Sequence, residues 1–188
     1  MMYPYVKRLL DLFFVLLFIA LTLPVWVLIP LIIFLQDGHN PIFKQKRVGK
    51  NGREFDFYKF RSMPISTPNV ESTEKDKIKI TPFGKILRQS NFDEITQIFN
   101  IIKGEMSWIG PRPPIPTQTN LIKLRKENKS LDLRPGITGW AQVHSYDNMP
   151  EEEKAKLDGE YAEKLSLNTD MLVFFKTFAY MFKKSPTY

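Results

Sequence analysis

The sequence predicts a mostly helical α+β fold, with an N-terminal re-entrant membrane helix, amphipathic interfacial helices and a small cytosolic domain that contains a short β-hairpin. Three observations support this prediction. No residue from Leu12 to Leu35 is charged, phenylalanines flank a turn at residues 50–52, and later segments repeat apolar residues at helical spacing. The apolar stretch defines a first region, residues 1–36, and the polar remainder defines a cytosolic domain, residues 37–188.

The apolar stretch is long enough for a membrane but contains a proline, Pro24, at its middle. Proline removes a helix hydrogen bond, so we expect two halves of about 12 residues, each roughly 18 Å long and shorter than a hydrocarbon layer of about 30 Å. Both flanks are basic, with Lys7 and Arg8 before the stretch and several Lys and Arg residues after it. A re-entrant helix kinked near Pro24 keeps both basic flanks on the cytoplasmic side and is favoured. A kinked spanning helix stays open as the alternative.

The polar region contains one predicted hairpin followed by several helices. The turn Lys50-Asn51-Gly52 predicts a β-hairpin within residues 36–64, and residues 65–80 have the composition of a surface loop. A helix that begins near Ser90 is expected to bury a face spaced i, i+3, i+4, i+7, formed by Ile95, Ile98, Phe99 and Ile102. Further helices are expected at residues 81–88, 117–129, 151–164 and 169–184. The last of these is aromatic and flanked by lysines, which suits either core packing or the membrane interface.

The composition excludes several kinds of site. The 188 residues include 27 Lys+Arg and 20 Asp+Glu, a formal charge of +7, with Cys 0 and His 2. Disulfides, thiolate metal sites and Cys nucleophiles are therefore excluded, and so is a three-His metal centre. The sequence has no Walker phosphate loop, no G-x-G-x-x-G and no G-x-S-x-G motif. Any metal must bind through oxygen ligands.

Asp93 and Glu94 form the best candidate for a reactive site, near the start of the helix expected from Ser90. Carboxylates in a first helical turn lie near free backbone N–H groups, and the helix dipole favours their ionised form. Adjacent side chains point about 100° apart around a helix, so one can act as a nucleophile while the other binds a hard cation such as Mg²⁺. Asp93 and Glu94 are thus candidates for catalysis and for the metal. The alternative is structural, since Ser90-x-x-Asp93 also fits a capping box.

Basic residues with apolar, Pro or Gly neighbours are the candidate substrate ligands. They are Lys59, Arg61, Arg88, Arg112 and Arg134. A guanidinium group binds phosphate oxygens in a bidentate way, and Pro111 and Pro113 place Arg112 on a stiff loop. Surface solvation or contact with anionic lipid is the alternative for each residue taken alone. The chain thus combines carboxylates, a metal site made of oxygen atoms and basic residues that bind phosphate, all beside a membrane. This combination suggests phosphoryl transfer to or from a lipid.

A series of motifs covers nearly the whole chain. They are Lys59-Phe60-Arg61-Ser62-Met63, Asp93-Glu94, Gln97-Ile98-Phe99-Asn100, Lys103-Gly104-Glu105-Met106-Ser107, Gly110-Pro111-Arg112-Pro113 and Arg134-Pro135-Gly136-Ile137-Thr138-Gly139. In this order the motifs resemble the bacterial sugar transferases, and more narrowly the small monotopic phosphoglycosyl transferases.

This resemblance implies an enzyme of the bacterial inner membrane with its catalytic domain on the cytoplasmic face. It implies transfer of a sugar-1-phosphate from a UDP-sugar to polyprenyl (undecaprenyl) phosphate with release of UMP, the first membrane step of glycan assembly. On that template Asp93 attacks the sugar-bearing phosphorus to form a covalent intermediate, and Glu94 holds Mg²⁺. Arg88 and Lys59 resemble phosphate-site positions, and Pro111-Arg112-Pro113 resembles the segment associated with the nucleotide.

The chain departs from the family pattern at two places. Leu23-Pro24 stands where many members have Ser-Pro, and Thr22 is expected to supply the back-bonding hydroxyl. The stretch from His144 to Asn148 replaces an Asn-Gly-Arg sequence, and we interpret His144 as a loop residue. Asp158 and Asp170 match carboxylates of the family, and we expect both to form structural pairs.

Two rival functions stay open on the sequence alone. A membrane-anchored basic module could bind anionic lipid or RNA, but carboxylates among the phosphate ligands argue against it, so we expect no nucleic-acid partner. The same substrates could also react by direct displacement, with Asp93 as a base. The expected partners are the UDP-sugar, polyprenyl phosphate, membrane lipids and, through the aromatic face of the membrane helix, a second copy of the chain as a homodimer. No short motif determines which sugar is transferred.

Overall fold

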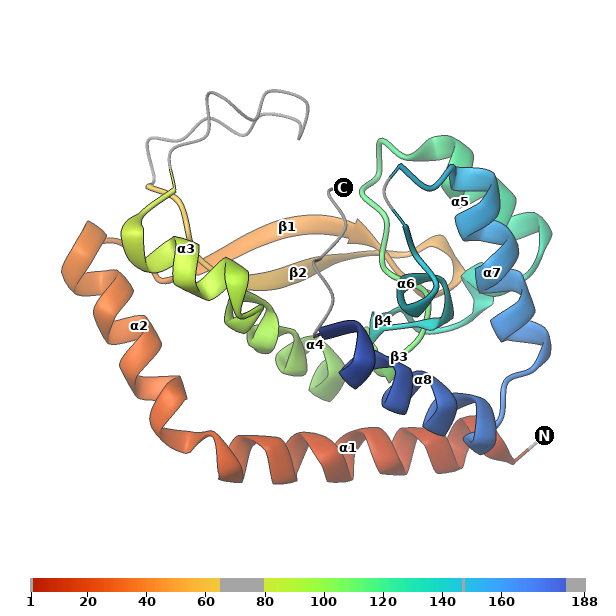
Figure 1. Cartoon of the computed structure of the whole chain (residues 1–188), viewed down its shortest axis with the longest axis horizontal. Helices are drawn as coiled ribbons and strands as arrows, with labels where there is room; N and C mark the ends of the chain where they lie inside the picture. Colours follow the sequence, from red (N-terminus) through yellow and green to blue (C-terminus); the bar gives the residue numbers. More distant parts are fainter. Residues whose placement is uncertain (1, 65–79, 147, 182–188) are drawn as a thin grey trace.

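The structure is a computed structural model that describes residues 2–64, 80–146 and 148–181. It is a mostly helical α+β fold with a small hairpin sheet, as predicted (Figure 1). The elements are α1 Tyr3–Leu21, α2 Leu23–Asp37, β1 Ile42–Val48, η1 Lys50–Gly52, β2 Glu54–Phe60, α3 Pro82–Gln89, η3 Phe92–Gln97, α4 Ile98–Lys103, β3 Ser107–Ile109, α5 Thr119–Glu127, η4 Ser130–Asp132, β4 Gly136–Thr138, α6 Trp140–Val143, α7 Glu151–Glu163 and α8 Leu167–Met181. The loop expected at residues 65–80 falls almost wholly outside the described residues.

The β-hairpin forms where the sequence predicts it. Strands β1 and β2 are antiparallel, with a register that runs from Ile42 opposite Phe60 to Val48 opposite Glu54. The connection is a short 3₁₀ turn in which Asn51 adopts a left-handed φ of 57°, a conformation that asparagine tolerates well. The alternation of side chains along β2 places Phe55 and Phe57 on one face, where they are buried together, whereas Phe60 is buried in a separate cluster.

Helices α1 and α2 meet at a bend of 68°. Helix α1 ends at Leu21, and Pro24 lies in the first turn of α2, where the missing N–H is tolerated. The Thr22 hydroxyl donates to the Phe18 carbonyl (2.6 Å) and accepts from the Trp26 indole (3.0 Å), which confirms the expected back-bonding at the break. Among the described residues no single helix is long and apolar enough to cross a membrane, whereas the bent pair has that length and composition together.

The core lies between the hairpin, α1 and α4. Val15 of α1, Phe55 and Phe57 of β2 and Ile98 and Ile101 of α4 are buried together. Burial of one such side chain contributes roughly 1.5–3 kcal/mol. A second cluster joins α2, β2 and α3, and a third joins β3, α7 and α8. The N-terminal helices therefore pack against the polar region on one face.

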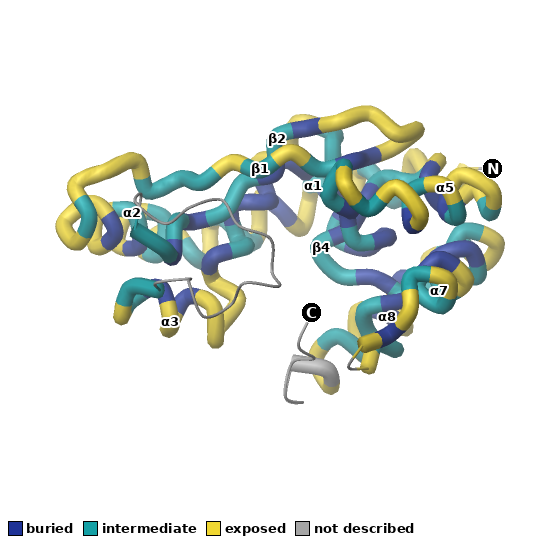
Figure 2. Tube along the Cα trace, turned by 90° about the horizontal axis from the view of Figure 1, so that it is seen from above, coloured by how far each residue is buried: buried dark blue, intermediate teal, exposed yellow. Residues whose placement is uncertain are grey.

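The opposite faces of α1, α2 and α8 expose large apolar side chains. They include Leu9, Phe13, Phe14, Leu16 and Leu17 on α1, Leu23, Val27, Leu28, Leu31, Ile32, Phe34 and Leu35 on α2, and Met171, Leu172, Phe174, Phe175 and Phe178 on α8. Figure 2 shows the exposed turns of α2 and α8 at the periphery of the molecule. Exposed apolar surface of this extent is typical of a membrane or protein contact.

The segment after Ser90 differs from the predicted continuous helix. It begins as the 3₁₀ helix η3 and becomes α-helical only at α4. Because a 3₁₀ helix has about 3 residues per turn, the buried face shifts, so the prediction of buried Phe99 and Ile102 is wrong: they are 42% and 45% exposed. The capping-box alternative is also wrong, since the Ser90 hydroxyl donates back to the Ile86 carbonyl (2.8 Å).

Two further strands, which the sequence analysis did not predict, form a short parallel pair. Ser107 of β3 lies opposite Gly136 of β4, and Ile109 lies opposite Thr138. Glycines allow this close approach: a Cβ on Gly136 would lie 2.1 Å from the Gly110 nitrogen. The pair places the Pro111-Arg112-Pro113 segment directly after β3.

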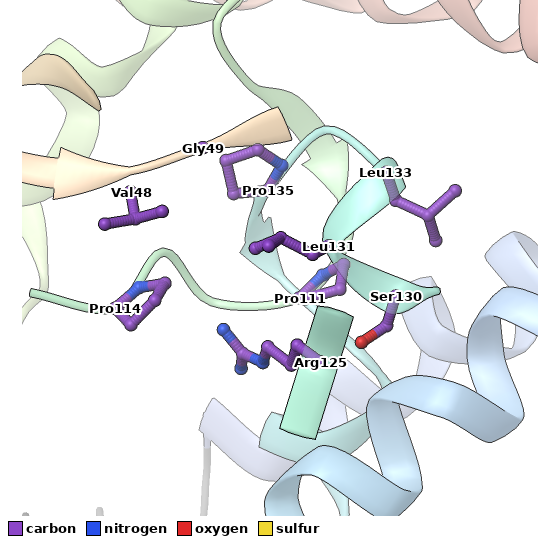
Figure 3. A pocket seen from close by; sticks show the side chains of 9 residues that line it. All are labelled: Val48, Gly49, Pro111, Pro114, Arg125, Ser130, Leu131, Leu133 and Pro135. Atoms are coloured by element: carbon purple, nitrogen blue, oxygen red, sulfur yellow. The ribbon is translucent and has the colours of Figure 1, made fainter. Parts of the chain in front are cut away.

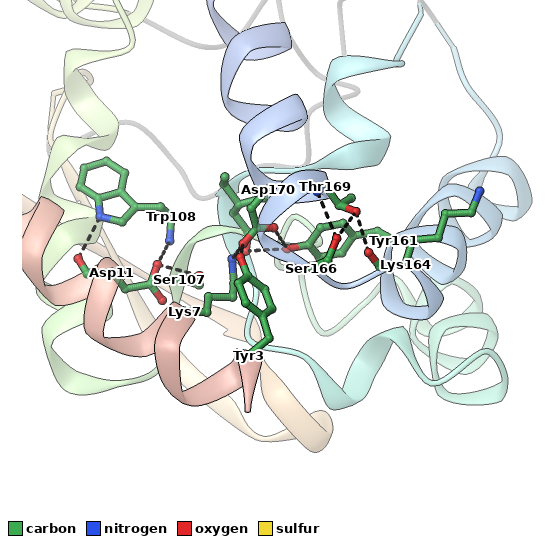
Figure 4. A network of polar contacts seen from close by, with 11 residues as sticks. Tyr3, Lys7, Asp11, Ser107, Trp108, Tyr161, Lys164, Ser166, Thr169 and Asp170 are labelled. Atoms are coloured by element: carbon green, nitrogen blue, oxygen red, sulfur yellow. Dashed lines mark hydrogen bonds and ion pairs between the residues drawn. The ribbon is translucent and has the colours of Figure 1, made fainter. Parts of the chain in front are cut away.

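A polar network fastens α1 to the rest of the protein (Figure 4). Asp170 of α8 accepts hydrogen bonds from the hydroxyls of Tyr3 and Tyr161, both at 2.5 Å, and pairs with Lys7. Asp11 accepts from the Ser107 hydroxyl (3.0 Å) and the Trp108 backbone nitrogen (3.1 Å). The expected structural pairing of Asp170 is thus confirmed.

Candidate functional site

Asp93 and Glu94 lie in the first turn of η3, packed against β2. The chain enters this turn through Asn91 in a left-handed conformation, with a φ of 57°. The Glu94 backbone nitrogen donates to the Asn91 carbonyl (3.1 Å). Asp93 is only 7% exposed. The short entry turn therefore directs two adjacent carboxylates into the interior instead of toward solvent.

The Glu94 carboxylate joins two basic residues from separate parts of the chain. Its Oε1 accepts from Lys59 Nζ of β2 (2.7 Å) and from Arg112 Nη2 of the proline-flanked loop (2.9 Å). Burial raises the pKa of this carboxyl, but Arg112 and Lys59 together outweigh burial and hold the pKa well below its usual range. Glu94 is therefore ionised at neutral pH. Three predicted site residues meet here at one oxygen atom.

The Asp93 carboxyl has the opposite electrostatic environment. Burial raises its pKa and the neighbouring Glu94 charge raises it further, while Lys59 and Arg88 oppose the increase. The helix dipole was expected to favour the ionised form of both carboxyls. For Asp93, burial outweighs the favourable contacts, and the pKa lies above its ordinary value.

Arg88 lies at the end of α3 beside the same region. Its Nε donates to the hydroxyl of buried Ser62 (2.9 Å), and its charge lowers the pKa of Asp93. Helix α3 is capped by Thr81, whose hydroxyl accepts from the Gly84 nitrogen (3.0 Å). The position of Arg88 thus depends on how closely α3 packs against the segment that follows β2.

Gly84 sets this packing distance, and substitution by alanine is expected to disturb it. A Cβ at residue 84 would lie 2.1 Å from the Ser62 carbonyl oxygen and 2.7 Å from Thr81 Oγ1, so α3 must move away. Overpacking of this kind costs about 1–3 kcal/mol. Thermal unfolding of Gly84→Ala should show a melting temperature lower by roughly 2–10 °C. The exposed neighbour Lys85→Ala is the control, and equal melting temperatures for the two variants would contradict the packing.

The Pro111–Pro114 segment is fixed through its backbone carbonyls. The Pro111 carbonyl accepts from the Gly136 backbone nitrogen (3.0 Å), and the Pro114 carbonyl accepts from the Val48 backbone nitrogen (2.9 Å). The Arg112 carbonyl accepts from the Arg125 guanidinium group (2.7 Å), and the Pro113 carbonyl accepts from the Arg47 guanidinium group (3.1 Å). These contacts are consistent with the stiff loop that the prolines predict.

The contacts of Arg61 and Arg134 lie apart from the carboxylates. Arg61 Nε donates to the Asn40 carbonyl (3.0 Å), and Arg134 Nε donates to the Gly104 carbonyl at the end of α4 (2.9 Å). Arg134 shares that helix end with Arg8, which donates to the Ile101 carbonyl (2.7 Å). A substrate role for Arg61 and Arg134 stays a prediction.

Sequence reasoning missed Arg47 and Arg125 as parts of this site. Arg47 lies over the ring of Phe57, with 5.3 Å between Cζ and the ring centroid, and burial together with the charge of Arg112 lowers its pKa to about 10. In the sequence Arg47 counted only as one of several basic residues after the apolar stretch. The one signal that the sequence offered for Arg47 was a basic residue between apolar positions of an expected strand. His144 follows α6, where its Nδ1 contacts the Trp140 carbonyl (2.8 Å).

A small apolar pocket lies behind the proline-flanked loop (Figure 3). Val48, Pro111, Pro114 and Leu131 line it, with Arg125 as the one charged group. Asp93 and Glu94 are absent from its lining. The candidate site is therefore the group of carboxylates and basic residues around Glu94, and the pocket lies outside it.

The oxygen atoms of Asp93 and Glu94 fit a magnesium ion only if a bound ligand supplies further oxygen atoms. Among the described residues no group of three His, Cys, Asp or Glu side chains could hold a metal. Asp93 and Glu94 provide carboxylate oxygens, and one Glu94 oxygen is already paired with Lys59 and Arg112. Because Mg²⁺ commonly uses one or two carboxylates plus substrate phosphates, the residues fit a metal that binds together with a phosphate-bearing substrate.

Comparisons with known proteins agree with the motif pattern. The family model described as bacterial sugar transferase matches residues 2–184. The UDP-N-acetylgalactosamine-undecaprenyl-phosphate N-acetylgalactosaminephosphotransferase of Aeromonas hydrophila is 34% identical over 93% of this chain and 43% of that protein. The uncharacterized sugar transferase EpsL of Bacillus subtilis is 31% identical over 89% of this chain and 82% of that protein. The UDP-glucose:undecaprenyl-phosphate glucose-1-phosphate transferase of Xanthomonas campestris is 37% identical over 70% of this chain and 29% of that protein. The chain thus spans less than half the length of the Aeromonas and Xanthomonas relatives.

Proposed function

Because this chain belongs to the bacterial sugar transferase family, we propose that it moves a sugar-1-phosphate from a UDP-sugar to polyprenyl phosphate and releases UMP. The observation that carries the proposal is the meeting of Lys59 and Arg112 on Glu94, next to buried Asp93. The names of the Aeromonas and Xanthomonas relatives support the donor and acceptor classes. Those names differ in their sugar, so the sugar stays open for this chain.

The charge balance of the site suits a diphosphate donor. Lys59, Arg88 and Arg112 surround two carboxylates, and Arg47 adds a further cation beside Arg112. The excess of positive charge favours an anionic ligand. A diphosphate that binds Lys59 and Arg112 competes with Glu94 for them, and this competition frees Glu94 to take part in metal binding.

The reaction follows in two displacements at one phosphorus atom. An Asp93 oxygen forms a bond to the sugar-bearing phosphorus, the bond from that phosphorus to the bridging oxygen breaks, and UMP leaves with the electron pair. A phosphate oxygen of the lipid then attacks the same phosphorus and releases the Asp93 carboxylate. Burial makes the Asp93 carboxylate a stronger base and nucleophile than a solvated one, while Lys59 and Arg88 favour its ionised form. Mg²⁺ held by Glu94 and Asp93 would supply charge neutralisation at the diphosphate.

We place the chain at the cytoplasmic face of the bacterial inner membrane. Residues 1–36 form the re-entrant helix, and residues 37–188 form the catalytic domain. The 68° bend between α1 and α2 and the exposed apolar faces of both helices support this placement. Helix α8 lies in the interface through its exposed phenylalanines and packs on the core through Val173, so both readings of this helix apply.

The experiment uses the chain purified in detergent or in lipid discs. The protein is incubated with Mg²⁺, polyprenyl phosphate and each member of a panel of UDP-sugars, and UMP release is measured. We expect release with at least one donor and a loss of release when EDTA removes the metal. No release with any donor would favour the membrane-anchored binding module instead.

A second measurement separates the covalent route from direct displacement. Radiolabelled UMP and unlabelled UDP-sugar are incubated with the protein in the absence of lipid. Exchange of label into UDP-sugar is expected, because the first displacement is reversible without an acceptor. Transfer to lipid without any exchange would support direct displacement with Asp93 as a base.

A further inference from the structure

A buried ion pair holds the backbone of Arg112 from behind. Arg125 of α5 donates from Nη1 to the Arg112 carbonyl (2.7 Å), and from Nε and Nη2 to Asp158 Oδ2 of α7 (2.9 and 2.6 Å). Arg125 is 4% exposed and Asp158 is 1% exposed. Figure 3 shows the Arg125 side chain extending from α5 alongside Pro111 and Pro114. The structural pairing expected for Asp158 is thus confirmed, but the pair also reaches the candidate site.

Arg112 connects this pair to Glu94. The Arg112 backbone is held by Arg125, and the Arg112 guanidinium donates to Glu94 Oε1 (2.9 Å). Pro111, Pro113 and Pro114 have no backbone N–H, so within this segment only Arg112 could donate a backbone hydrogen bond. The position of the segment therefore depends on the groups that donate hydrogen bonds to its carbonyl oxygens. At the Arg112 carbonyl that group is Arg125.

Stability alone gives no reason to keep a buried ion pair at this place. Desolvation of two charges offsets most of their attraction, and well-packed apolar residues often replace such pairs without loss of stability. Apolar residues cannot donate to the Arg112 carbonyl, however, and a lysine has no planar fork that serves Asp158 and this carbonyl together. The guanidinium group is therefore required for the joint contact.

We infer that Arg125 and Asp158 are positioning residues that hold the Arg112 guanidinium in place for the diphosphate of the donor. Asp158 orients Arg125, Arg125 fixes the Arg112 backbone, and Arg112 presents its guanidinium next to Glu94. Neither Arg125 nor Asp158 needs to touch the substrate. This inference rests on the proposed function, since it assigns the group that Arg112 binds.

The first test replaces the pair without leaving a lone buried charge. Arg125→Met/Asp158→Leu should keep the melting temperature close to that of wild type but lower kcat/KM for UDP-sugar about 10- to 100-fold, because misplacement of a ligand group by about 1 Å has that effect. The loss should appear mainly in the KM for the donor, and UDP affinity measured by calorimetry should fall in parallel. The KM for polyprenyl phosphate should change little. Lys126→Met, an exposed neighbour on α5, is the matched control and should behave as wild type.

The second test asks whether the pair acts through Arg112. In an Arg112→Ala background the same double substitution should cost less than 3-fold, because the group that it positions is gone. An equal fold-loss with and without Arg112 would overturn the inference, and so would wild-type donor KM and UDP affinity in the folded double variant. Wild-type protein that neither turns over UDP-sugar nor binds UDP would instead overturn the proposed function and this inference with it.

Discussion

Replacement of Asp93 by asparagine is expected to abolish UMP release while slightly raising the melting temperature. The amide cannot form the bond to phosphorus, and loss of a nucleophile lowers kcat by roughly 10³-fold or more. The rise in stability follows from the pKa of Asp93, which burial raises above its ordinary value, so the ionised side chain destabilises the folded state at neutral pH. Asparagine removes that charge. Initial rates of UMP release and thermal unfolding at pH 7 measure the two effects.

The sign of the stability change can be checked with pH. A carboxyl whose folded pKa is raised contributes stability below its unfolded pKa and loses this contribution as the pH rises through the folded pKa. The melting-temperature difference between Asp93→Asn and wild type should therefore shrink when both are measured near pH 4. Asp56→Asn, at a solvent-exposed ion pair on β2, is the control for the same chemical change. UMP release by Asp93→Asn within 10-fold of wild type would remove the basis of the proposed mechanism.

Replacement of Glu94 by glutamine should lower both activity and stability. The substitution leaves Lys59 and Arg112, whose side chains are 22% and 36% exposed, without the charge that they share. Breaking a fully buried pair costs about 3–5 kcal/mol, and partial exposure reduces the expected loss to about 1–3 kcal/mol. Glu94 is also the carboxylate proposed to hold the metal and to organise the basic ligands. Its loss is therefore expected to lower kcat by roughly 10²-fold. Calorimetric unfolding and UMP release measure these changes.

The stability loss in Glu94→Gln should depend on pH in the direction opposite to that of Asp93. The folded pKa of Glu94 is depressed, so its contribution is present above the ordinary glutamate pKa of about 4.3 and is lost as the pH falls below that value. The difference in unfolding free energy between variant and wild type should thus be largest near pH 7 and smallest near pH 3. Glu163→Gln, at an exposed position of α7, is the control. A difference that grows toward pH 3 would contradict the assignment of the ion pairs.

Local patterns in the sequence predicted much of the fold. The hairpin followed from a turn and aromatic residues spaced as in strands, and the helix expected at residues 151–164 forms as α7. The 3₁₀ entry at η3 was not predictable in this way, because the apolar spacing after Ser90 suits a regular α-helix and gives no signal for a tighter turn. Strands β3 and β4 were missed because segments of this length are too short for a visible alternation and pair only through tertiary contact.

The sequence predicted which residues form the site but not the directions in which their pKa values shift. Motifs identified Lys59, Glu94 and Arg112, and the structure joins them at one oxygen atom. Asp93 and Glu94 are adjacent in sequence, yet their pKa values move in opposite directions, because neighbours from β2 and the loop after β3 decide the outcome. Asp158 was expected to form a structural pair, but no local signal identified Arg125 as its partner, since the pairing exists only where α5 and α7 pack together.

The polar network around Asp170 connects the first turns of α1 to the first turn of α8. If α1 and α8 rest on a bilayer, these contacts help to set the height of the Asp93 carboxylate above the lipid phosphates. Polyprenyl phosphate carries its phosphate directly on the isoprenoid chain, so this phosphate would have to lie at the same height in the interface to react at Asp93.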